Sequence, residues 1–185
     1  MARAQKLDLR LFQQELATRL ASKTAAQVES SRLGFAGAGR QWLIRLSDAA
    51  EVITMPQVAS VPLTKPWFLG IANIRGNLHT VVDFAGYLGG PTLAMGGAGS
   101  SNRMVLFGPR TGELKVGIAV ERVLGLRNLA ELVPAAPSAD SLSWYSERWM
   151  DADGGPWQEI DLTRLARDPV FLQVGLRSAF LRVGR

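Results

Sequence analysis

Few residues of this chain could do acid–base chemistry. The single histidine, His79, lies in an alternating apolar and polar segment, and Asp83 follows four residues later. In an extended strand these two side chains share a face but lie far apart. No serine stands on the sharp turn that a catalytic nucleophile requires. We therefore interpret His79 as a structural residue and predict no catalytic residues and no enzymatic activity.

The sequence also argues against a metal or cofactor site. Cysteine is absent, which excludes disulfides, thiolate metal sites and a cysteine nucleophile. Residues 151–155, DADGG, begin like a calcium loop, but the later ligand positions do not follow at the required spacing. We interpret this segment as a hairpin turn. The glycines at 34, 37 and 39 do not form a phosphate-binding pattern, so we predict no metal and no cofactor.

One charged residue stands out within residues 67–84, WFLGIANIRGNLHTVVDF. Arg75 lies between two apolar runs, where a permanently charged guanidinium must reach water or meet a partner. Gly76 and Asn77 follow it, and both tolerate positive φ, so we predict a turn at residues 75–77. The question is then which partner Arg75 meets.

Charge and hydropathy limit the classes of partner. The net charge is +5, from 21 basic and 16 acidic residues, which indicates a mild preference for acidic partners. Aromatic residues do not alternate with basic ones as in a single-stranded nucleic-acid platform, so we expect no nucleic-acid partner. The N-terminus lacks the apolar core of a signal peptide. No apolar stretch approaches the roughly 20 residues of a membrane span, so we expect a cytoplasmic protein without direct membrane insertion.

The elements that must position these residues are mostly strands. From residue 33 onward, short apolar segments recur between Gly, Pro, Asn and Asp, which favours a β-barrel or sandwich. The predicted strands are residues 32–36, 41–46, 70–74, 78–84, 103–107 and 114–120. Residues 108–112, GPRTG, predict a turn between the last two. We expect the aromatic residues of the C-terminal third to fill a core or an interface; they are Trp144, Tyr145, Trp149 and Trp157.

Two domains are predicted, with boundaries at 1–29 and 30–185. In the first, Asp8 caps an amphipathic helix that runs to about Ala21, followed by a polar linker. Its apolar stripe consists of Leu9, Phe12, Leu16 and Leu20. In the second, residues 86–102 predict a long flexible Gly-rich loop. A short helix at 161–167 begins at Asp161 or Glu159 and is closed by Pro169.

The segment around Arg75 resembles a known family. Residues 70–76, GIANIRG, followed by VVDF at 81–84, resemble the signature of the CheW family. Residues 116–126, VGIAVERVLGL, look like its second landmark, and Glu51 resembles its acidic position after the first bend. The similarity covers about residues 30–175. Thr80 departs from it, since the family usually has proline there, as does the segment 144–155.

This resemblance implies a mainly β fold of two SH3-like five-stranded β-barrels around a shared core, with an N-terminal helix and a short C-terminal helix. It implies a scaffold that couples the cytoplasmic tip of a methyl-accepting chemoreceptor to the regulatory domain of a CheA-type histidine kinase. The N-terminal helix and residues 66–89 look most like the branch that controls type IV pili and twitching motility. A flagellar chemotaxis coupling protein and, from a different class, a nucleic-acid-binding small barrel remain the alternatives.

Two hypotheses about the site follow. Arg75 is expected to pair with Glu51, which would hold the turn beside a groove between the barrels. That groove is expected to accept the helical receptor tip. The predicted partner-binding residues are Ala49, Glu51, Val52, Asn73, Arg75, Gly76 and Val123.

Overall fold

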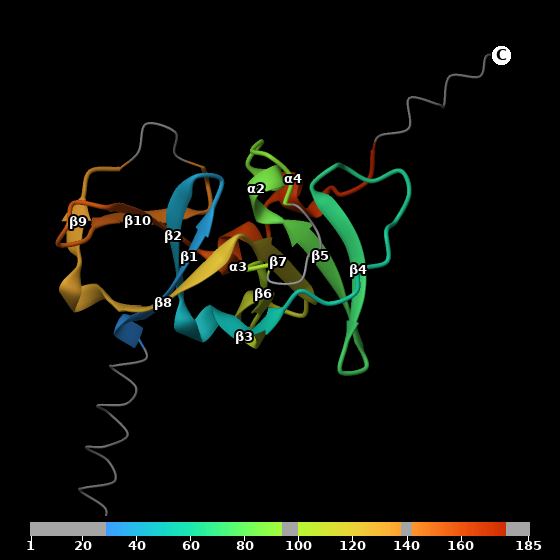
Figure 1. Ribbon diagram of the computed structural model, residues 1–185, viewed down its shortest axis with the longest axis horizontal. Helices are drawn as coiled ribbons and strands as arrows, with labels where there is room; N and C mark the ends of the chain where they lie inside the picture. The colour runs from blue at the N-terminus through green and yellow to red at the C-terminus, as the bar shows by residue number, and fades with distance from the viewer. Residues whose placement is uncertain (1–28, 94–99, 138–141, 177–185) are drawn as a thin grey trace, which may run out of the picture.

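The computed structural model describes residues 29–93, 100–137 and 142–176. These residues form two β-sheets, with the six-stranded sheet on the left of Figure 1 and the five-stranded sheet on the right. The chain is therefore mainly β, as predicted. The N-terminal helix predicted at 8–21 lies outside the described residues.

The six-stranded sheet combines the first and last parts of the described chain. Its strand order is β8-β1-β2-β11-β10-β9. The strands are β1 (Ser31–Gly37), β2 (Arg40–Arg45), β8 (Arg122–Asn128), β9 (Val133–Ala135), β10 (Tyr145–Met150) and β11 (Pro156–Ile160). All neighbours are antiparallel except β2 and β11, which run parallel. This parallel ladder joins segments more than a hundred positions apart in the sequence.

The five-stranded sheet comes from the middle of the chain. Its order is β3-β6-β7-β5-β4, with β5 and β7 parallel and the other neighbours antiparallel. The strands are β3 (Ala49–Thr54), β4 (Phe68–Ile74), β5 (Asn77–Asp83), β6 (Arg103–Phe107) and β7 (Val116–Val120). All six predicted strand segments are confirmed, because each overlaps one of β1, β2, β4, β5, β6 and β7.

Between residues 84 and 172 the described chain forms three short helices, and each is preceded by an aspartate whose side chain accepts a backbone N–H. They are α2 (Phe84–Tyr87), α3 (Leu162–Leu165) and α4 (Pro169–Leu172), capped by Asp83, Asp161 and Asp168. Single turns of 3-10 helix are η1 (Leu46–Asp48), η2 (Pro109–Thr111) and η3 (Leu129–Glu131). The helix predicted from Asp161 is confirmed. Pro169 follows the end of α3, as predicted, and it also begins α4, where the missing N–H of proline costs nothing.

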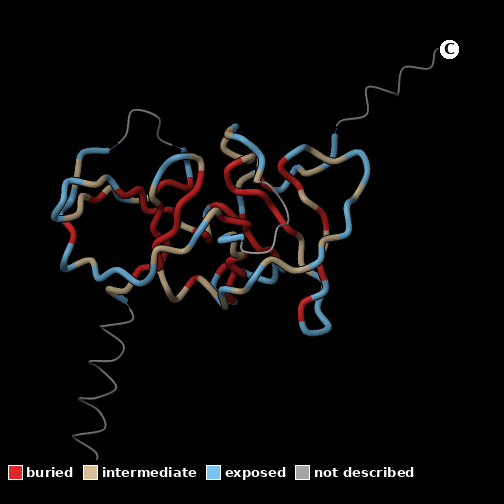
Figure 2. Tube along the Cα trace, viewed as in Figure 1, coloured by how far each residue is buried: buried red, intermediate tan, exposed pale blue. Residues whose placement is uncertain are grey.

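The core has one large central cluster and two smaller ones. The central cluster draws buried side chains from both sheets, with Trp42 and Phe84 in edge-to-face contact at 5.1 Å. Figure 2 shows buried segments running through the middle of both halves. A second cluster lies on the five-stranded sheet: Ala72, Ile74, Val81, Met104 and Leu106. A third lies on the six-stranded sheet: Leu43, Leu132, Trp149 and Trp157. The aromatic residues of the C-terminal third fill this core, as predicted.

Two details of the prediction change. The sheets have five and six strands rather than five each, because β9 adds a short edge strand to the larger one. In each sheet of the described chain, the first and last strands of the order are not paired with each other. The predicted loop at 86–102 starts later, because α2 includes Gly86 and Tyr87. Asp83 explains this start: it is fully buried and also accepts a hydrogen bond from the backbone N–H of Leu93 at 2.7 Å. Residues 94–99 of that loop lie outside the described part of the chain.

Candidate partner-binding surface

The turn that presents Arg75 is a two-residue hairpin loop between β4 and β5. Ile74 pairs with Asn77, so Arg75 and Gly76 are the only residues of the loop. Their φ angles are 51° and 84°, as in the two central positions of a type I′ turn. The structure confirms the turn but corrects its residues: Arg75, rather than Asn77, takes the positive φ that L-residues rarely adopt.

The hairpin loop is fixed by side chains at both of its sides. Asn73 Oδ1 accepts a hydrogen bond from the backbone N–H of Gly76 at 2.9 Å. Lys115 Nζ donates to Asn77 Oδ1 at 2.6 Å, which ties the start of β5 to the segment before β7. These contacts hold the loop in one conformation. The guanidinium of Arg75 is thus presented from a defined position.

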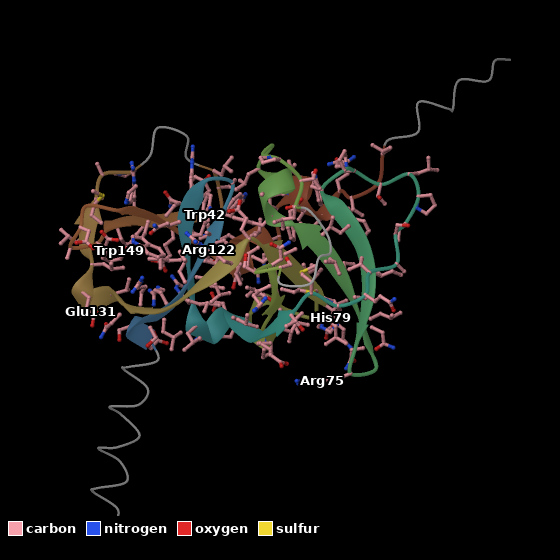
Figure 3. The ribbon with its side chains drawn as sticks, in the orientation of Figure 1. Trp42, Arg75, His79, Arg122, Glu131 and Trp149 are labelled. Carbon is pink, nitrogen blue, oxygen red and sulfur yellow. The ribbon has the colours of Figure 1, made fainter. Side chains whose placement is uncertain are left out.

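Arg75 pairs with Glu51 of β3, as the first hypothesis expects. The Arg75 Nη2 to Glu51 Oε1 distance is 2.7 Å. The side chains are 76% and 35% exposed, so this is a surface ion pair. Such a pair contributes less than about 1 kcal/mol to stability, since water screens both charges. Figure 3 shows Arg75 at the free end of the hairpin, where a partner could reach it.

The apolar members of the predicted site lie on a different face. Along β3, Ala49 pairs with Phe107 and Val52 with Val105, and both partners belong to the central cluster. Glu51 instead pairs with Leu106, which belongs to the cluster on the opposite face. Val52 and Glu51 therefore point away from each other, as neighbours in a strand do.

The seven predicted residues thus form two groups. The first group consists of the two loop residues, Arg75 and Gly76, and the side chains that contact them, Glu51 and Asn73. Ala49 from β3 and Val123 from β8 both pack against the central cluster, which places one in each sheet beside the shared core. Val52 is exposed on the Ala49 side of β3. Partner binding by any of the seven stays a prediction.

The side chains of His79 and Asp83, the candidate acid–base residues, each lie within hydrogen-bond distance of nearby backbone atoms. His79 Nδ1 lies 3.2 Å from the carbonyl oxygen of Asn77, and the side chain is half-buried. Asp83 is buried and occupied by the backbone N–H groups of Gly86 and Leu93. These hydrogen bonds do not join His79 to Asp83, and the structural role of His79 stays a prediction.

Asp151 is the organiser of the hairpin turn between β10 and β11, as predicted for DADGG. Its Oδ1 accepts backbone N–H groups from Asp153 and Gly155, and its Oδ2 accepts the indole N–H of Trp157. The Trp157 hydrogen bond is the main cause that lowers the pKa of Asp151. No cluster of three or more histidine, aspartate or glutamate side chains suited to a metal ion occurs within the described residues.

Sequence reasoning missed a buried polar network in the six-stranded sheet. Arg32 Nε donates to Glu159 Oε1 at 2.8 Å, and Trp149 Nε1 donates to Glu159 Oε2 at 3.0 Å. Arg32 Nη1 also donates to the carbonyl of Glu29, the first described residue. No sequence signal marked this network, because 127 positions separate Arg32 from Glu159.

Asp48 is a second buried acid that the sequence did not mark. It lies in η1, between a strand of one sheet and a strand of the other. Its Oδ1 is 3.6 Å from Arg110 Nε, while Oδ2 is buried without a hydrogen-bond partner in the described structure. Burial raises the pKa of Asp48, and the nearby guanidinium groups of Arg45 and Arg110 partly oppose that rise.

Together, the described residues form two mixed sheets around one core, with a surface ion pair on a fixed hairpin. The family model described as CheW-like domain matches residues 32–170. The chain therefore belongs to the CheW-like domain family. In the described ranges, no helix combines the length and apolar character needed to cross a membrane.

Two individual proteins are similar to the chain. Protein PilI of Pseudomonas aeruginosa is 36% identical over 75 residues, which cover 38% of this chain and 42% of PilI. The aligned stretch therefore spans less than half the length of that relative. The scaffolding protein TtCheW from Thermoanaerobacter tengcongensis has a crystal structure that matches with a TM-score of 0.60 at 18% identity. That match covers 72% of this chain and 89% of TtCheW, and it supports the fold.

Proposed function

We propose that this protein is a non-enzymatic scaffold that couples the cytoplasmic tip of a methyl-accepting chemoreceptor to the regulatory domain of a CheA-type histidine kinase. Membership of the CheW-like domain family carries this proposal. The resemblance noted in the sequence supplies the two partner classes. The protein would act in the cytoplasm, recruited to receptor arrays at the membrane.

The hairpin end is the part of the receptor-binding surface that the geometry supports best. Arg75 donates to Glu51 through Nη2, yet most of its side chain is exposed, so further N–H groups can reach a partner. Because Asn73 fixes the loop, little conformational entropy is lost when a partner binds there. Ala49, Val52 and Val123 provide apolar surface near the shared core for a helical receptor tip.

The similarity to PilI favours a pathway that controls type IV pili and twitching motility over flagellar chemotaxis. A strain that lacks this protein should then lose twitching while it keeps swimming. The reverse phenotype would assign the protein to flagellar chemotaxis and reject the pilus proposal.

A binding experiment with both partners tests the scaffold proposal. The full-length chain is mixed with a receptor-tip fragment and with the kinase regulatory domain, separately and together, and binding is measured by affinity co-purification. Arg75→Ala should weaken receptor binding about tenfold, as truncation of an interface arginine commonly does. Arg40→Ala is the matched control, because Arg40 is an exposed arginine at the start of β2 in the other sheet.

A charge-swapped variant distinguishes a role of the Arg75–Glu51 ion pair from a direct contact between Arg75 and the receptor. Glu51→Arg combined with Arg75→Glu keeps an ion pair but reverses its direction. If the pair only holds the loop, this variant restores receptor binding; if Arg75 contacts the receptor, binding stays weak. Equal binding by wild type and Arg75→Ala would remove the hairpin from the receptor surface. Failure to bind either partner would reject the scaffold function itself.

A further inference from the structure

An apolar hollow lies on the five-stranded half, and none of the seven predicted partner-binding residues lines it. Its volume is about 430 Å³, and its buried lining includes Phe68, Val82, Val116 and Phe171. We call it the α4 hollow, because α4 contributes Phe171 and Leu172. A hollow of this size and lining has room for large apolar side chains from another segment.

Exposed leucines surround the α4 hollow. Leu114 and Leu172 line it and are 38% and 47% exposed. Leu63 and Leu176 extend the apolar surface, since the backbone N–H of Leu176 donates to the carbonyl of Leu63 at 2.9 Å beside the lining residue Val174. Leu63 also has a φ of 59°, a strained conformation for a leucine that points into solvent. Contiguous exposed apolar surface of this kind marks an interaction site.

The start of the described chain is joined by an ion pair to the segment that leads into the hollow. Glu29 Oε1 lies 3.7 Å from Arg110 Nη1, and the Glu29 carbonyl accepts a hydrogen bond from Arg32. Arg110 precedes Glu113, a lining residue of the α4 hollow, by only three positions. Three residues span at most about 11 Å. Residues before Glu29 therefore leave the body within reach of the hollow.

The sequence before Glu29 has the pattern that such a surface would accept. Its amphipathic segment, residues 8–21, carries Leu9, Phe12, Leu16 and Leu20 on one stripe. As a helix it would be about 21 Å long. The seven linker residues 22–28 can span up to about 25 Å, which is enough to lay this helix along the α4 hollow.

We propose that the N-terminal segment 8–21 docks in cis as an amphipathic helix over the α4 hollow, with Phe12 and Leu16 inserted between Leu114 and Leu172. The short linker keeps this segment at a high effective concentration near the hollow. Any partner that uses the same surface must therefore displace it. This proposal is independent of the receptor and kinase partners proposed above, because none of the seven predicted partner-binding residues lines the α4 hollow.

Disulfide trapping in the full-length chain tests the docking directly, because the natural chain has no cysteine to interfere. The test variant combines Phe12→Cys with Leu172→Cys. The matched control combines Gln13→Cys with Leu172→Cys, which moves the thiol one residue along to the polar side of the helix. Under mild oxidation, the test pair should form an intramolecular disulfide about tenfold faster than the control, at a rate independent of protein concentration.

Each other outcome overturns the proposal. Equal rates for the two pairs mean that the helix has no defined orientation on the hollow. Cross-links only between molecules assign the hollow to a second copy of the chain. A third variant, Phe180→Cys with Leu172→Cys, detects the alternative in which the C-terminal segment fills the hollow.

Hydrogen exchange provides a readout that does not depend on introduced thiols. Leu16→Asp should accelerate amide exchange at residues 113–116 and 170–174 at least about threefold, while Gln14→Asp on the polar side should not. Far-ultraviolet circular dichroism confirms that both variants stay folded. Unchanged exchange in Leu16→Asp would show that the hollow is uncovered in the intact protein.

Discussion

The ion pair Arg32–Glu159 in the six-stranded sheet and the ion pair Arg75–Glu51 beside the five-stranded sheet have nearly the same length, 2.8 and 2.7 Å. Their surroundings differ. The side chains of Arg32 and Glu159 are 8% and 2% exposed, whereas Arg75 is mostly in water. The arginine–glutamate attraction therefore acts in a low effective dielectric in the Arg32–Glu159 pair and in a high one in the Arg75–Glu51 pair.

Hydrogen bonding follows the same division. Glu159 accepts from Arg32 and from the indole of Trp149, with Arg45 Nε at 3.8 Å, so both carboxylate oxygens are occupied. Arg75 has one short contact, to Glu51, and the rest of its guanidinium faces solvent. The buried pair stabilises the fold, whereas the exposed pair has N–H groups that remain accessible to a partner. Distance alone would not have separated these two roles.

Breaking the buried pair should have the largest effect on stability. Glu159→Gln leaves the guanidinium of Arg32 buried without its counter-charge, which should lower the free energy of unfolding by about 3–5 kcal/mol. Urea unfolding followed by tryptophan fluorescence measures this loss. Replacing both members, Arg32→Met with Glu159→Leu, should recover part of it, because no unpaired charge is then buried, although the indole N–H of Trp149 loses its acceptor. A loss below about 1 kcal/mol in Glu159→Gln would place this pair in the same energetic class as Arg75–Glu51.

Breaking the exposed pair should change stability much less. Arg75→Ala is expected to lower the free energy of unfolding by under about 1 kcal/mol, and 1 M salt should reduce even that difference. The same urea titration at low and high salt provides the measurement. A cost above about 2 kcal/mol that persists in high salt would mean that Arg75 holds the fold as Glu159 does, and the division of roles would fail.

The hairpin with Arg75 was predictable because local signals agree there. Residues 70–74 and 78–84 read as strands, and Gly76 marks the turn between them. The pairing of Arg75 with Glu51 came from the family resemblance, because the sequence does not say that β3 passes beside the hairpin. Sequence reasoning also grouped Glu51 with Val52. It had not identified residues 49–54 as a strand, so the alternation that separates the two side chains was not applied.

The buried pair could not be predicted for a different reason. β10 and β11 read YSERWM and PWQEI, with charged residues inside both, so neither segment has the apolar pattern of a buried strand. Glu159 becomes a core residue only when β11 aligns parallel to β2, a long-range pairing that no local pattern encodes. β8 reads RVLGLRN, where Val123 and Leu124 are adjacent apolar residues followed by Gly125, so its sequence lacks the alternation of a half-buried strand.

The smallest expected effects concern two aspartates that should respond oppositely to pH. Burial raises the pKa of Asp48 above its ordinary 3.8, so the folded state binds the proton more tightly than the unfolded state. The stability that this provides at low pH is lost as pH rises from about 3.8 through the folded pKa. For Asp151, the Trp157 hydrogen bond lowers the pKa, so its contribution is present above 3.8 and is lost as pH falls below it.

Single amide variants separate these two aspartates. Asp48→Asn should gain stability relative to wild type near neutral pH, because it removes an ionised carboxylate from a buried site, and this gain should vanish at low pH. Asp151→Asn should lose stability near neutral pH, with that loss vanishing at low pH. Urea midpoints of both variants and wild type across the acidic range test the two signs. If the two variants respond to pH in the same direction, burial does not decide the role of a charge in this molecule as the comparison of the two ion pairs implies.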